Sequence, residues 1–281
     1  MNTIPQFLNE FLKSQYEENI AKNIINGYSK NRPVTLRANT LKTNIDYIKN
    51  IFTKLNISYI NVPWYSDALI LKNISEEQLK NLDIYKNGFI YLQSLSSMIP
   101  PIILNPQENE NILDMTAAPG GKTTEMLALS NNKSFITACE KNKIRAERLK
   151  YNINKQGANK VNVMLTDARN LDNFFSFDKI LLDVPCMGIG VIKRKPDIKW
   201  HRKPEDLKVI SKVQYEILEN CSKYVKKGGT IIYSTCSILE KENHGIIQKF
   251  LEKNPIYTTT EIKIEPTEKQ DGFYIAKLIK K

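Results

Sequence analysis

The sequence predicts an α/β protein, a doubly wound parallel sheet with a small N-terminal α/β module. After residue 111, short apolar segments alternate regularly with stretches of helical periodicity, a pattern typical of parallel sheets. The stretch NILDMTAAPGGKTTE (111–125) predicts a buried strand, a turn of small residues and the start of a helix. In an open parallel sheet, such a turn lies at the carboxyl ends of the strands, where ligands bind.

The turn of small residues is the first candidate binding site. It consists of Ala117, Ala118, Pro119, Gly120 and Gly121, and it leaves backbone N–H groups open to a negatively charged ligand. A P-loop is excluded, because Thr116 stands where that motif needs a glycine, and the turn supplies no G-x-G-x-x-G pattern. The glycine pair alone is equally consistent with a structural turn, so the residues downstream must decide.

The N-terminal third of the chain predicts helices and strands in alternation. Residues 2–27 have apolar residues at helical spacing and predict one or two amphipathic helices, with Gly27 as the stop. Asn44 is a candidate helix cap, and Ser75 with Gln78 has the spacing of a capping box. The polar stretch 105–111 separates two predicted domains, 1–108 and 109–281. The expected strands are 33–39, 57–62 and 68–71, and the expected helix is 46–55.

The second domain continues the alternation to the end of the chain. Each expected strand has an apolar run, and each expected helix has apolar residues three or four positions apart. Glycines mark two of the turns, Gly157 and the pair at 228–229. The expected strands are 134–139, 161–165, 178–182, 230–234 and 273–279, and the expected helices are 143–156, 205–225 and 240–251.

Composition limits the possible functions. The net charge of +11, from 41 basic and 30 acidic residues, suits a nucleic-acid partner, but a lysine-rich composition explains it equally well. No apolar run is long enough to span a bilayer, and the N-terminus lacks the pattern of a signal peptide. We therefore expect a soluble, cytoplasmic protein with no membrane partner. Four cysteines without a CxxC pair, and only two histidines, argue against a metal site.

Three acidic residues each stand just after a predicted strand: Glu140, Asp167 and Asp183. In a doubly wound sheet these positions face the ligand crevice. The carboxylate of Glu140 suits a ribose diol, because it accepts hydrogen bonds from both hydroxyls, and Asp167 suits an adenine amino group. Any one of these acids is better explained as a helix cap, but three of them behind a turn of small residues favour a ligand site.

Two cysteines also stand at strand ends. Cys186 follows the fourth strand of the sheet and Cys236 follows the fifth, and these two strands are neighbours in this topology. We therefore expect both thiols to face one pocket. Cys139 and Cys221 fall within predicted elements, where cysteine is usually a small buried residue.

Together these stretches closely resemble the Nop/Sun family of S-adenosylmethionine-dependent RNA cytosine-5 methyltransferases. The resemblance rests on PVTLRANTLKTN (33–44), DMTAAPGGKTT (114–124), LLDVPCMGIGVIKRKPDIKW (181–200), YSTCS (233–237) and DGFYIAKL (271–278). It implies a Rossmann-like methyltransferase sheet at 109–281, behind a helical and RRM-like RNA-binding module at 1–108. The implied substrate is a cytosine in ribosomal RNA, with transfer RNA as the second choice, and we expect a monomer.

The resemblance also assigns roles to residues. Cys236 is the implied nucleophile that attacks cytosine C6, and Cys186 assists removal of the C5 proton. Asp183 binds the N3 and N4 edge of the base, which must be unpaired or flipped out. Lys122 lies between cofactor and base, where its charge lowers the pKa of a nearby thiol. The implied cofactor-binding residues are Ala117, Ala118, Pro119, Gly120, Gly121, Lys122, Glu140, Arg145, Asp167 and Asp183.

A basic loop follows Cys186, and we expect Lys193, Arg194 and Lys195 to contact RNA phosphates. A solvated loop without that role is the alternative. Three departures from the family pattern are Met187, where serine is usual, Thr116, where cysteine or alanine is common, and His244 in ENH, where glutamate is usual.

Three other functions remain open. An amine N-methyltransferase on the same fold would have an aromatic after Pro-Pro where DVPC stands (183–186). A non-catalytic RNA-binding factor would not need both thiols. In the DNA cytosine methyltransferase arrangement, Cys186 would attack the base instead of Cys236.

Overall fold

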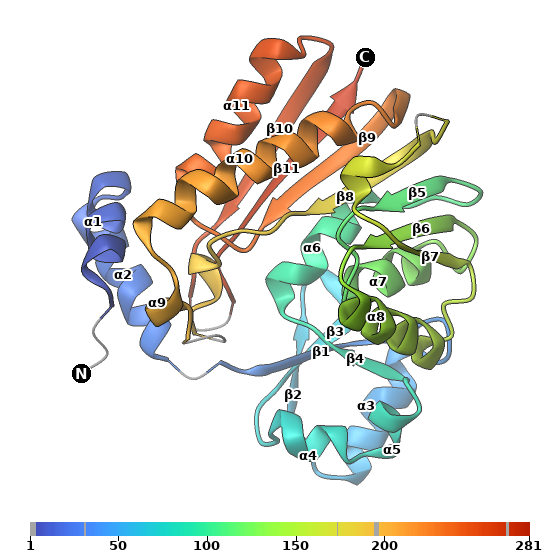
Figure 1. The fold of residues 1–281 in the computed structure, drawn as a ribbon. Coiled ribbons are helices and arrows are strands. Elements are labelled where there is room, and N and C mark those ends of the chain that lie inside the picture. Colours follow the sequence, from blue (N-terminus) through green and yellow to red (C-terminus); the bar gives the residue numbers. More distant parts are fainter. Residues whose placement is uncertain (1–3, 31, 173, 194–196, 268–269) are drawn as a thin grey trace. The chain divides into compact units, whose positions relative to one another are not determined.

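The structure is a computed structural model that describes residues 4–30, 32–172, 174–193, 197–267 and 270–281 (Figure 1). The chain forms two compact units. The first unit consists of Met1–Arg32 and Leu182–Lys281, and the second of Pro33–Leu181. Strand β8 (Phe177–Asp183) carries the chain from the second unit into the first.

A parallel sheet forms one part of the second unit. Its strands lie in the order β8-β5-β6-β7, and β5 pairs in parallel with both β6 and β8. The apolar residues that predicted these strands are buried, among them Ile112, Leu113 and Ile180. Helix α8 has the predicted bounds, and Gly157 ends it with a left-handed φ of 72°. These observations confirm the Rossmann-like α/β prediction. The elements are β5 (Asn111–Asp114), α7 (Gly121–Leu129), β6 (Phe135–Glu140), α8 (Lys143–Gln156), β7 (Val161–Leu165) and η1 (Ala168–Asn170).

An antiparallel sheet of order β2-β3-β1-β4 forms the other part of the second unit. Both predicted caps are confirmed. Asn44 accepts the N–H of Tyr47, and Ser75 forms a capping box with Gln78. Strand β4 has only three residues and α6 contains two prolines, which explains why periodicity indicated neither. The elements are β1 (Val34–Ala38), α3 (Ile45–Lys54), β2 (Tyr59–Val62), β3 (Tyr65–Leu71), α4 (Glu76–Lys80), α5 (Asp83–Lys86), β4 (Ile90–Leu92) and α6 (Leu95–Leu104).

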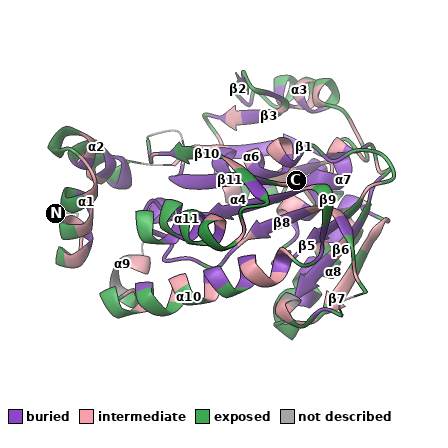
Figure 2. Ribbon diagram, turned by 90° about the horizontal axis from the view of Figure 1, so that it is seen from above, coloured by how far each residue is buried: buried purple, intermediate pink, exposed green. Residues whose placement is uncertain are grey.

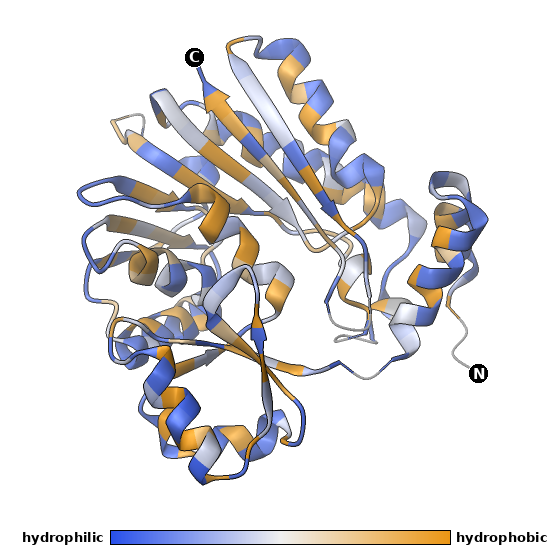
Figure 3. Cartoon of the chain, turned by 180° about the vertical axis from the view of Figure 1, so that it is seen from behind, coloured by the Kyte–Doolittle hydropathy of each residue, from blue (hydrophilic) through white to orange (hydrophobic). Residues whose placement is uncertain are grey.

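The strands of the first unit differ from the prediction of an all-parallel sheet. β9 (Val225–Thr235) pairs antiparallel with β11 (Phe273–Lys280), which pairs antiparallel with β10 (Tyr257–Ile264). The sequence does not predict β10, because this strand has no apolar run and exposes four of its eight residues, Thr258, Thr260, Ile262 and Lys263. Figure 2 shows β9 and β11 buried along most of their lengths, and Figure 3 shows hydrophobic residues along them.

The helices of the first unit correct three predictions. Helix α10 (Pro204–Cys221) ends before residue 225, the predicted end. The prediction ran too far because Tyr224 and Val225 continue the apolar spacing of the helix up to the start of β9. The stretch predicted as one helix at 240–251 is broken at Asn243 into η3 (Glu240–Glu242) and α11 (His244–Lys253). Gly27 lies inside α2 and does not end it. The remaining helices are α1 (Gln6–Gln15), α2 (Glu18–Ser29), η2 (Ile189–Val191) and α9 (Ile198–His201).

Helices α1 and α2 share a hydrophobic core with the loop that carries Cys186. Leu8, Leu12 and Ile24 are buried against a group of apolar residues that includes Met187 and Ile189. A side chain at Gly27 would bring its Cβ within 3.2 Å of the Pro266 carbonyl oxygen, so this glycine permits close packing. Within the described residues, no helix is long and apolar enough to cross a membrane.

Candidate active site

Two cysteines meet at the ends of β8 and β9 in the first unit. Val184 donates its backbone N–H to the Ser234 carbonyl at 3.0 Å, which aligns the two chain segments. Cys186 follows the first segment and Cys236 the second. Their sulfur atoms lie 3.1 Å apart, although 50 residues separate them in sequence. Cys186 is 8% exposed, whereas Cys236 is only partly buried.

The environment of the pair distinguishes the two thiols. The hydrogen bond with Cys236 raises the pKa of Cys186 well above its ordinary value, and burial and the carboxylates of Glu242 and Asp183 raise it further. Cys186 is therefore protonated at neutral pH and can donate its S–H to Cys236. Because an S–H donor stabilises a neighbouring thiolate, the arrangement favours the more exposed Cys236 as the nucleophile.

A third residue, Glu242, joins the two cysteine loops. Its side chain is fully buried, and its Oε1 accepts hydrogen bonds from the Met187 backbone N–H at 2.7 Å and from Gln214 Nε2 at 3.1 Å. Its Oε2 accepts the Ser237 hydroxyl. Met187 follows Cys186 and Ser237 follows Cys236, so one carboxylate holds both loops. Burial raises the pKa of Glu242.

The sequence does not indicate a role for Glu242. It lies in the charged run Glu240-Lys241-Glu242, and such a run usually indicates a solvated surface. The contact with Met187 is relevant because serine is usual at position 187 in the family. The bond to Glu242 uses the backbone N–H, so it does not depend on the side chain at 187.

Further contacts fix the neighbouring groups. Ser234 Oγ donates to Asp183 Oδ1 at 3.1 Å, which orients this half-buried carboxylate. Arg202 Nη2 donates to the Cys186 carbonyl at 3.1 Å. Gly190 donates its N–H to the Cys236 carbonyl at 3.0 Å, and a Cβ at Gly190 would lie 2.2 Å from the Gly272 carbonyl oxygen. No other residue fits at Gly190 without movement of the backbone.

The basic loop is described only in part. Lys193 Nζ donates to the Thr267 carbonyl at 3.5 Å in an exposed position. Arg194 and Lys195, which we also expect to bind phosphates, lie outside the described residues.

The turn of small residues lies in the second unit and is held by α8. Gly120 has a φ of 104°, and a Cβ there would approach Leu149 Cδ1 to 2.9 Å. Arg145 Nη2 donates to the Ala118 carbonyl at 2.8 Å, and Asn152 Nδ2 donates to the Pro119 carbonyl at 2.7 Å. Because α8 residues bind the carbonyl groups of Ala118 and Pro119, the turn at the start of α7 has a fixed conformation.

Glu140 and Asp167, the two predicted cofactor-binding acids of the second unit that follow strands, have basic partners. Glu140 is 4% exposed, and its Oε2 lies 3.2 Å from Arg145 Nη1. Asp167 binds the Arg169 guanidinium at 3.0 and 2.7 Å, and these hydrogen bonds lower its pKa. Asp167 also caps η1 through the Arg169 N–H, so part of its position is explained by capping.

The remaining predicted residues of this unit have simpler surroundings. Lys122 Nζ donates to Ser97 Oγ at 2.8 Å. Cys139 is fully buried, as is Cys221 in the first unit, which confirms the prediction that both are buried, and burial raises the pKa of each. In the part of the chain that the structure describes, no group of three or more His, Cys, Asp or Glu residues could hold a metal ion.

Comparison with known proteins gives two matching family models. One, described as 16S rRNA methyltransferase RsmB/F, matches residues 101–279. The other, described as an RsmF/B-like ferredoxin-like domain, matches residues 4–76.

Individual relatives agree with these matches. Ribosomal RNA small subunit methyltransferase B of Shewanella oneidensis is 34% identical over 98% of this chain and 67% of its own length. The protein of the same name from Yersinia pseudotuberculosis is 35% identical over 92% of this chain and 62% of its own length. The chain thus spans about two thirds of the curated relatives it matches. A solved methyltransferase homolog protein from Pyrococcus horikoshii, 27% identical, superposes with a TM-score of 0.83 over 99% of this chain and 100% of its own.

Proposed function

This chain belongs to the RsmB/F family of 16S rRNA methyltransferases, and on that premise we propose that it methylates C5 of a cytosine in small-subunit ribosomal RNA. The observation that carries the proposal is the thiol pair, with sulfur atoms 3.1 Å apart. Cytosine C5 is a poor nucleophile, and a thiol that adds to C6 overcomes this. Neither an amine N-methyltransferase nor a non-catalytic RNA-binding protein needs two thiols in contact.

S-adenosylmethionine is the cofactor of this family, and when bound it supplies an electrophilic methyl group on its sulfonium. Residues of the second unit fit it. Gly120 belongs to a turn without bulky side chains, and its φ of 104° is one that side chains rarely adopt. The buried carboxylate of Glu140 stands at the end of β6 and suits a ribose diol. We propose that Glu140, Arg145 and Asp167, together with the turn 117–121, hold the cofactor.

The protein's own contribution begins with the thiols. Cys236, as a thiolate stabilised by the Cys186 S–H, forms a bond to C6 of the cytosine, and the ring electrons shift to C5. Asp183, fixed by Ser234, hydrogen-bonds the N3 and N4 edge and stabilises the charge that develops there. Once C5 is methylated, Cys186 assists transfer of the C5 proton to a water molecule. The electrons of that C–H bond restore the ring, and the bond between C6 and Cys236 breaks.

Exchange of each cysteine tests this assignment. Cys236→Ala should abolish methylation of 16S rRNA and form no covalent adduct. Cys186→Ala should accumulate an adduct between Cys236 and the RNA, visible as a slowly migrating band on a denaturing gel. Cys221→Ala is the matched control, because it makes the same change at a buried structural cysteine, and it should form no stable adduct. An adduct that requires Cys186 and survives loss of Cys236 would falsify the assignment.

We further propose that the basic loop contacts phosphates beside the target base. If so, Lys193→Ala and Arg194→Ala should each reduce the slope of log Kd against log salt by about 0.7, the value for one single-strand phosphate. An unchanged slope in both variants rejects this role.

The remaining parts of the proposal concern organisation. Residues 1–108 would form an RNA-binding module and 109–281 the methyltransferase domain, in agreement with the separate family matches at 4–76 and 101–279. We expect the protein to act in the cytoplasm, because its ribosomal RNA substrate is found there. We also expect it to be a monomer. Elution as a dimer in size-exclusion chromatography would contradict the monomer.

A further inference from the structure

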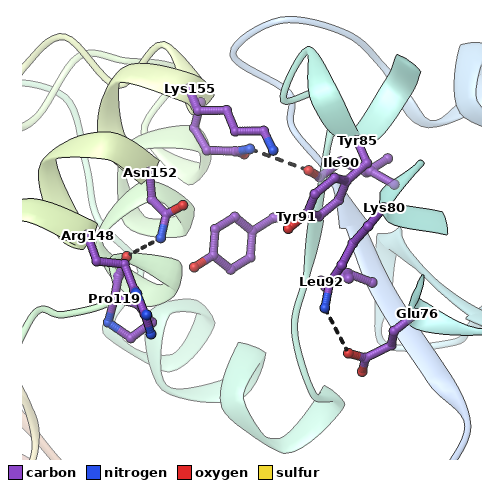
Figure 4. Close-up of a pocket in the computed structure, with 11 residues that line it drawn as sticks. Glu76, Lys80, Tyr85, Ile90, Tyr91, Leu92, Pro119, Arg148, Asn152 and Lys155 are labelled. Atoms are coloured by element: carbon purple, nitrogen blue, oxygen red, sulfur yellow. Dashed lines mark hydrogen bonds and ion pairs between the residues drawn. The ribbon is translucent and has the colours of Figure 1, made fainter. Parts of the chain in front are cut away.

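A cavity of about 230 Å³ lies within the second unit. Its walls come from α4, α5 and β4 on one side and from α8 on the other, and Pro119 of the turn contributes to them (Figure 4). No cysteine is among its described lining residues. The volume is below the roughly 300–1,000 Å³ of sites for drug-sized ligands, so it suits a single ring system with its substituent.

Two tyrosines give the cavity flat apolar surfaces. Tyr91 projects from β4 into the middle of the cavity, between Asn152 of α8 and Leu92 (Figure 4). The Arg37 guanidinium lies 5.2 Å from the centre of the Tyr91 ring, and a Cβ at Gly121 would lie 3.0 Å from Tyr91 Cε1. The ring is therefore held in place from behind. Burial raises the pKa of Tyr91 to about 12, so its hydroxyl stays neutral.

The second aromatic wall is Tyr85 of α5. The Lys155 ammonium stands 3.8 Å from the centre of its ring. This pair combines a flat face with a cation, which is the combination that proteins use to bind a nucleobase next to its phosphate.

A buried amide supplies a specific polar group. Gln156, at the end of α8, is 2% exposed and lines the cavity. Its Nε2 donates to the Ile90 carbonyl at 3.4 Å, which orients the amide, and within the described structure its Oε1 accepts no hydrogen bond. A buried acceptor without a donor is unfavourable. The exocyclic amine of adenine, cytosine or guanine is a donor that would satisfy it.

The charge of the walls is positive. Lys80, Arg148 and Lys155 line the cavity against one acid, Glu76, whose carboxylate lies 3.8 Å from Lys80 Nζ. Burial and the nearby Lys42 lower the pKa of Lys155. Because these cations repel one another, an anion among them would be stabilised.

We propose that this cavity binds one unpaired nucleotide of the RNA substrate. The base lies against Tyr85 and Tyr91 with its amine on Gln156 Oε1, and the phosphate lies among Lys80, Arg148 and Lys155. The inference rests on the proposed function in that it takes RNA as the substrate. It adds a binding position on the RNA that is separate from the target cytosine.

Binding of labelled 16S rRNA to the full-length protein tests the proposal. Tyr85→Ala should weaken RNA binding about tenfold, in the range found for a single stacking contact. Arg148→Ala removes a phosphate contact and should also weaken RNA binding. Arg148→Ala should also lower the salt slope by about 0.7. Lys150→Ala is the matched control. Lys150 is an exposed residue of α8 that pairs with Glu147 and does not line the cavity, so its loss should leave the affinity unchanged.

A second measurement does not depend on how the variants fold. Unmodified 16S rRNA, irradiated with ultraviolet light in complex with the unaltered protein, should cross-link to the peptide that carries Tyr85 and Tyr91. Absence of this cross-link, together with Arg148→Ala binding as tightly as Lys150→Ala, overturns the proposal. Binding of adenosine monophosphate that is lost in Arg148→Ala, without any effect on RNA, also overturns it and indicates a free-nucleotide site.

The outcomes separate this inference from the proposed function. If unaltered protein methylates cytosine in 16S rRNA while the cavity variants bind RNA normally, only the cavity proposal fails. If unaltered protein neither binds nor methylates 16S rRNA, the proposed function fails as well.

Discussion

The buried carboxylate of Glu242 accepts the backbone N–H of Met187 at 2.7 Å, and its other oxygen accepts the Ser237 hydroxyl. These partners directly follow Cys186 and Cys236. Glu242 thus holds in place the two loops whose cysteine sulfur atoms lie 3.1 Å apart, although these hydrogen bonds of its carboxylate go to Met187 and Ser237 and not to the cysteines.

Glu242→Ala should destabilise the protein by about 2–4 kcal/mol, because it leaves the buried Met187 N–H and Ser237 hydroxyl without their acceptor. It should also slow adduct formation by Cys236 when combined with Cys186→Ala. Glu242→Gln keeps an oxygen acceptor for the Met187 N–H, and its loss of unfolding free energy should be less than half of that in Glu242→Ala. Urea denaturation measures the first effect and gel analysis of the adduct the second. Equal stability of Glu242→Ala and unaltered protein would rule out the clamping role.

The four thiols should differ in reactivity towards iodoacetamide at pH 7.5. Burial raises the pKa values of Cys139 and Cys221, and the hydrogen bond with Cys236 raises that of Cys186. A raised pKa means less thiolate, so Cys236 should be alkylated about tenfold faster than the others. Mass spectrometry of the digested protein measures each rate. Faster alkylation of Cys186 than of Cys236 would reverse their proposed roles.

Cofactor binding should depend on the acids of the second unit. Glu140→Ala removes a 4%-exposed carboxylate, and we expect S-adenosylmethionine to bind about tenfold more weakly, the effect of one lost charged hydrogen bond. Asp167→Ala should weaken binding as well. Isothermal titration calorimetry gives the affinities, and Glu147→Ala, at an exposed position of α8, serves as the control. No heat of binding with unaltered protein would contradict the cofactor assignment.

Stability should vary with pH because of Glu125. Burial raises the pKa of this carboxyl from 4.5 to about 8, although Arg37 and Gln93 act in the opposite direction. Between those values the folded protein holds a proton that the unfolded chain has lost. The contribution of this bound proton to the free energy of unfolding is therefore complete below about pH 4.5 and is lost as the pH rises through 8.

Glu125→Gln removes this titration. Its unfolding free energy should fall less steeply than that of unaltered protein between pH 5 and 8, by up to about 1.4 kcal/mol per pH unit. Urea denaturation across this range makes the comparison, with the exposed Glu147→Gln as control. Parallel curves for the Glu125→Gln and unaltered proteins would show that Glu125 does not titrate in this window.

Predictions from the sequence were best where a feature is local. The bounds of α8 and β7 and the caps at Asn44 and Ser75 agree with the structure, because periodicity and capping involve residues within a few positions of each other. Strand β10 was missed because it is only partly buried and has no apolar run. The end of α10 was misplaced because the apolar spacing continues into β9.

By itself, the sequence determined the alternation of strands and helices over residues 111–165, the turn of small residues and the positions of two cysteines at strand ends. Only the tertiary structure decided that Glu242 is buried between the cysteine loops and that Gln156 and Arg148 share a cavity with residues from α5 and β4. The physical reason is that burial of a polar group depends on contacts from residues far away in the chain. The local periodicity of a sequence does not predict such contacts.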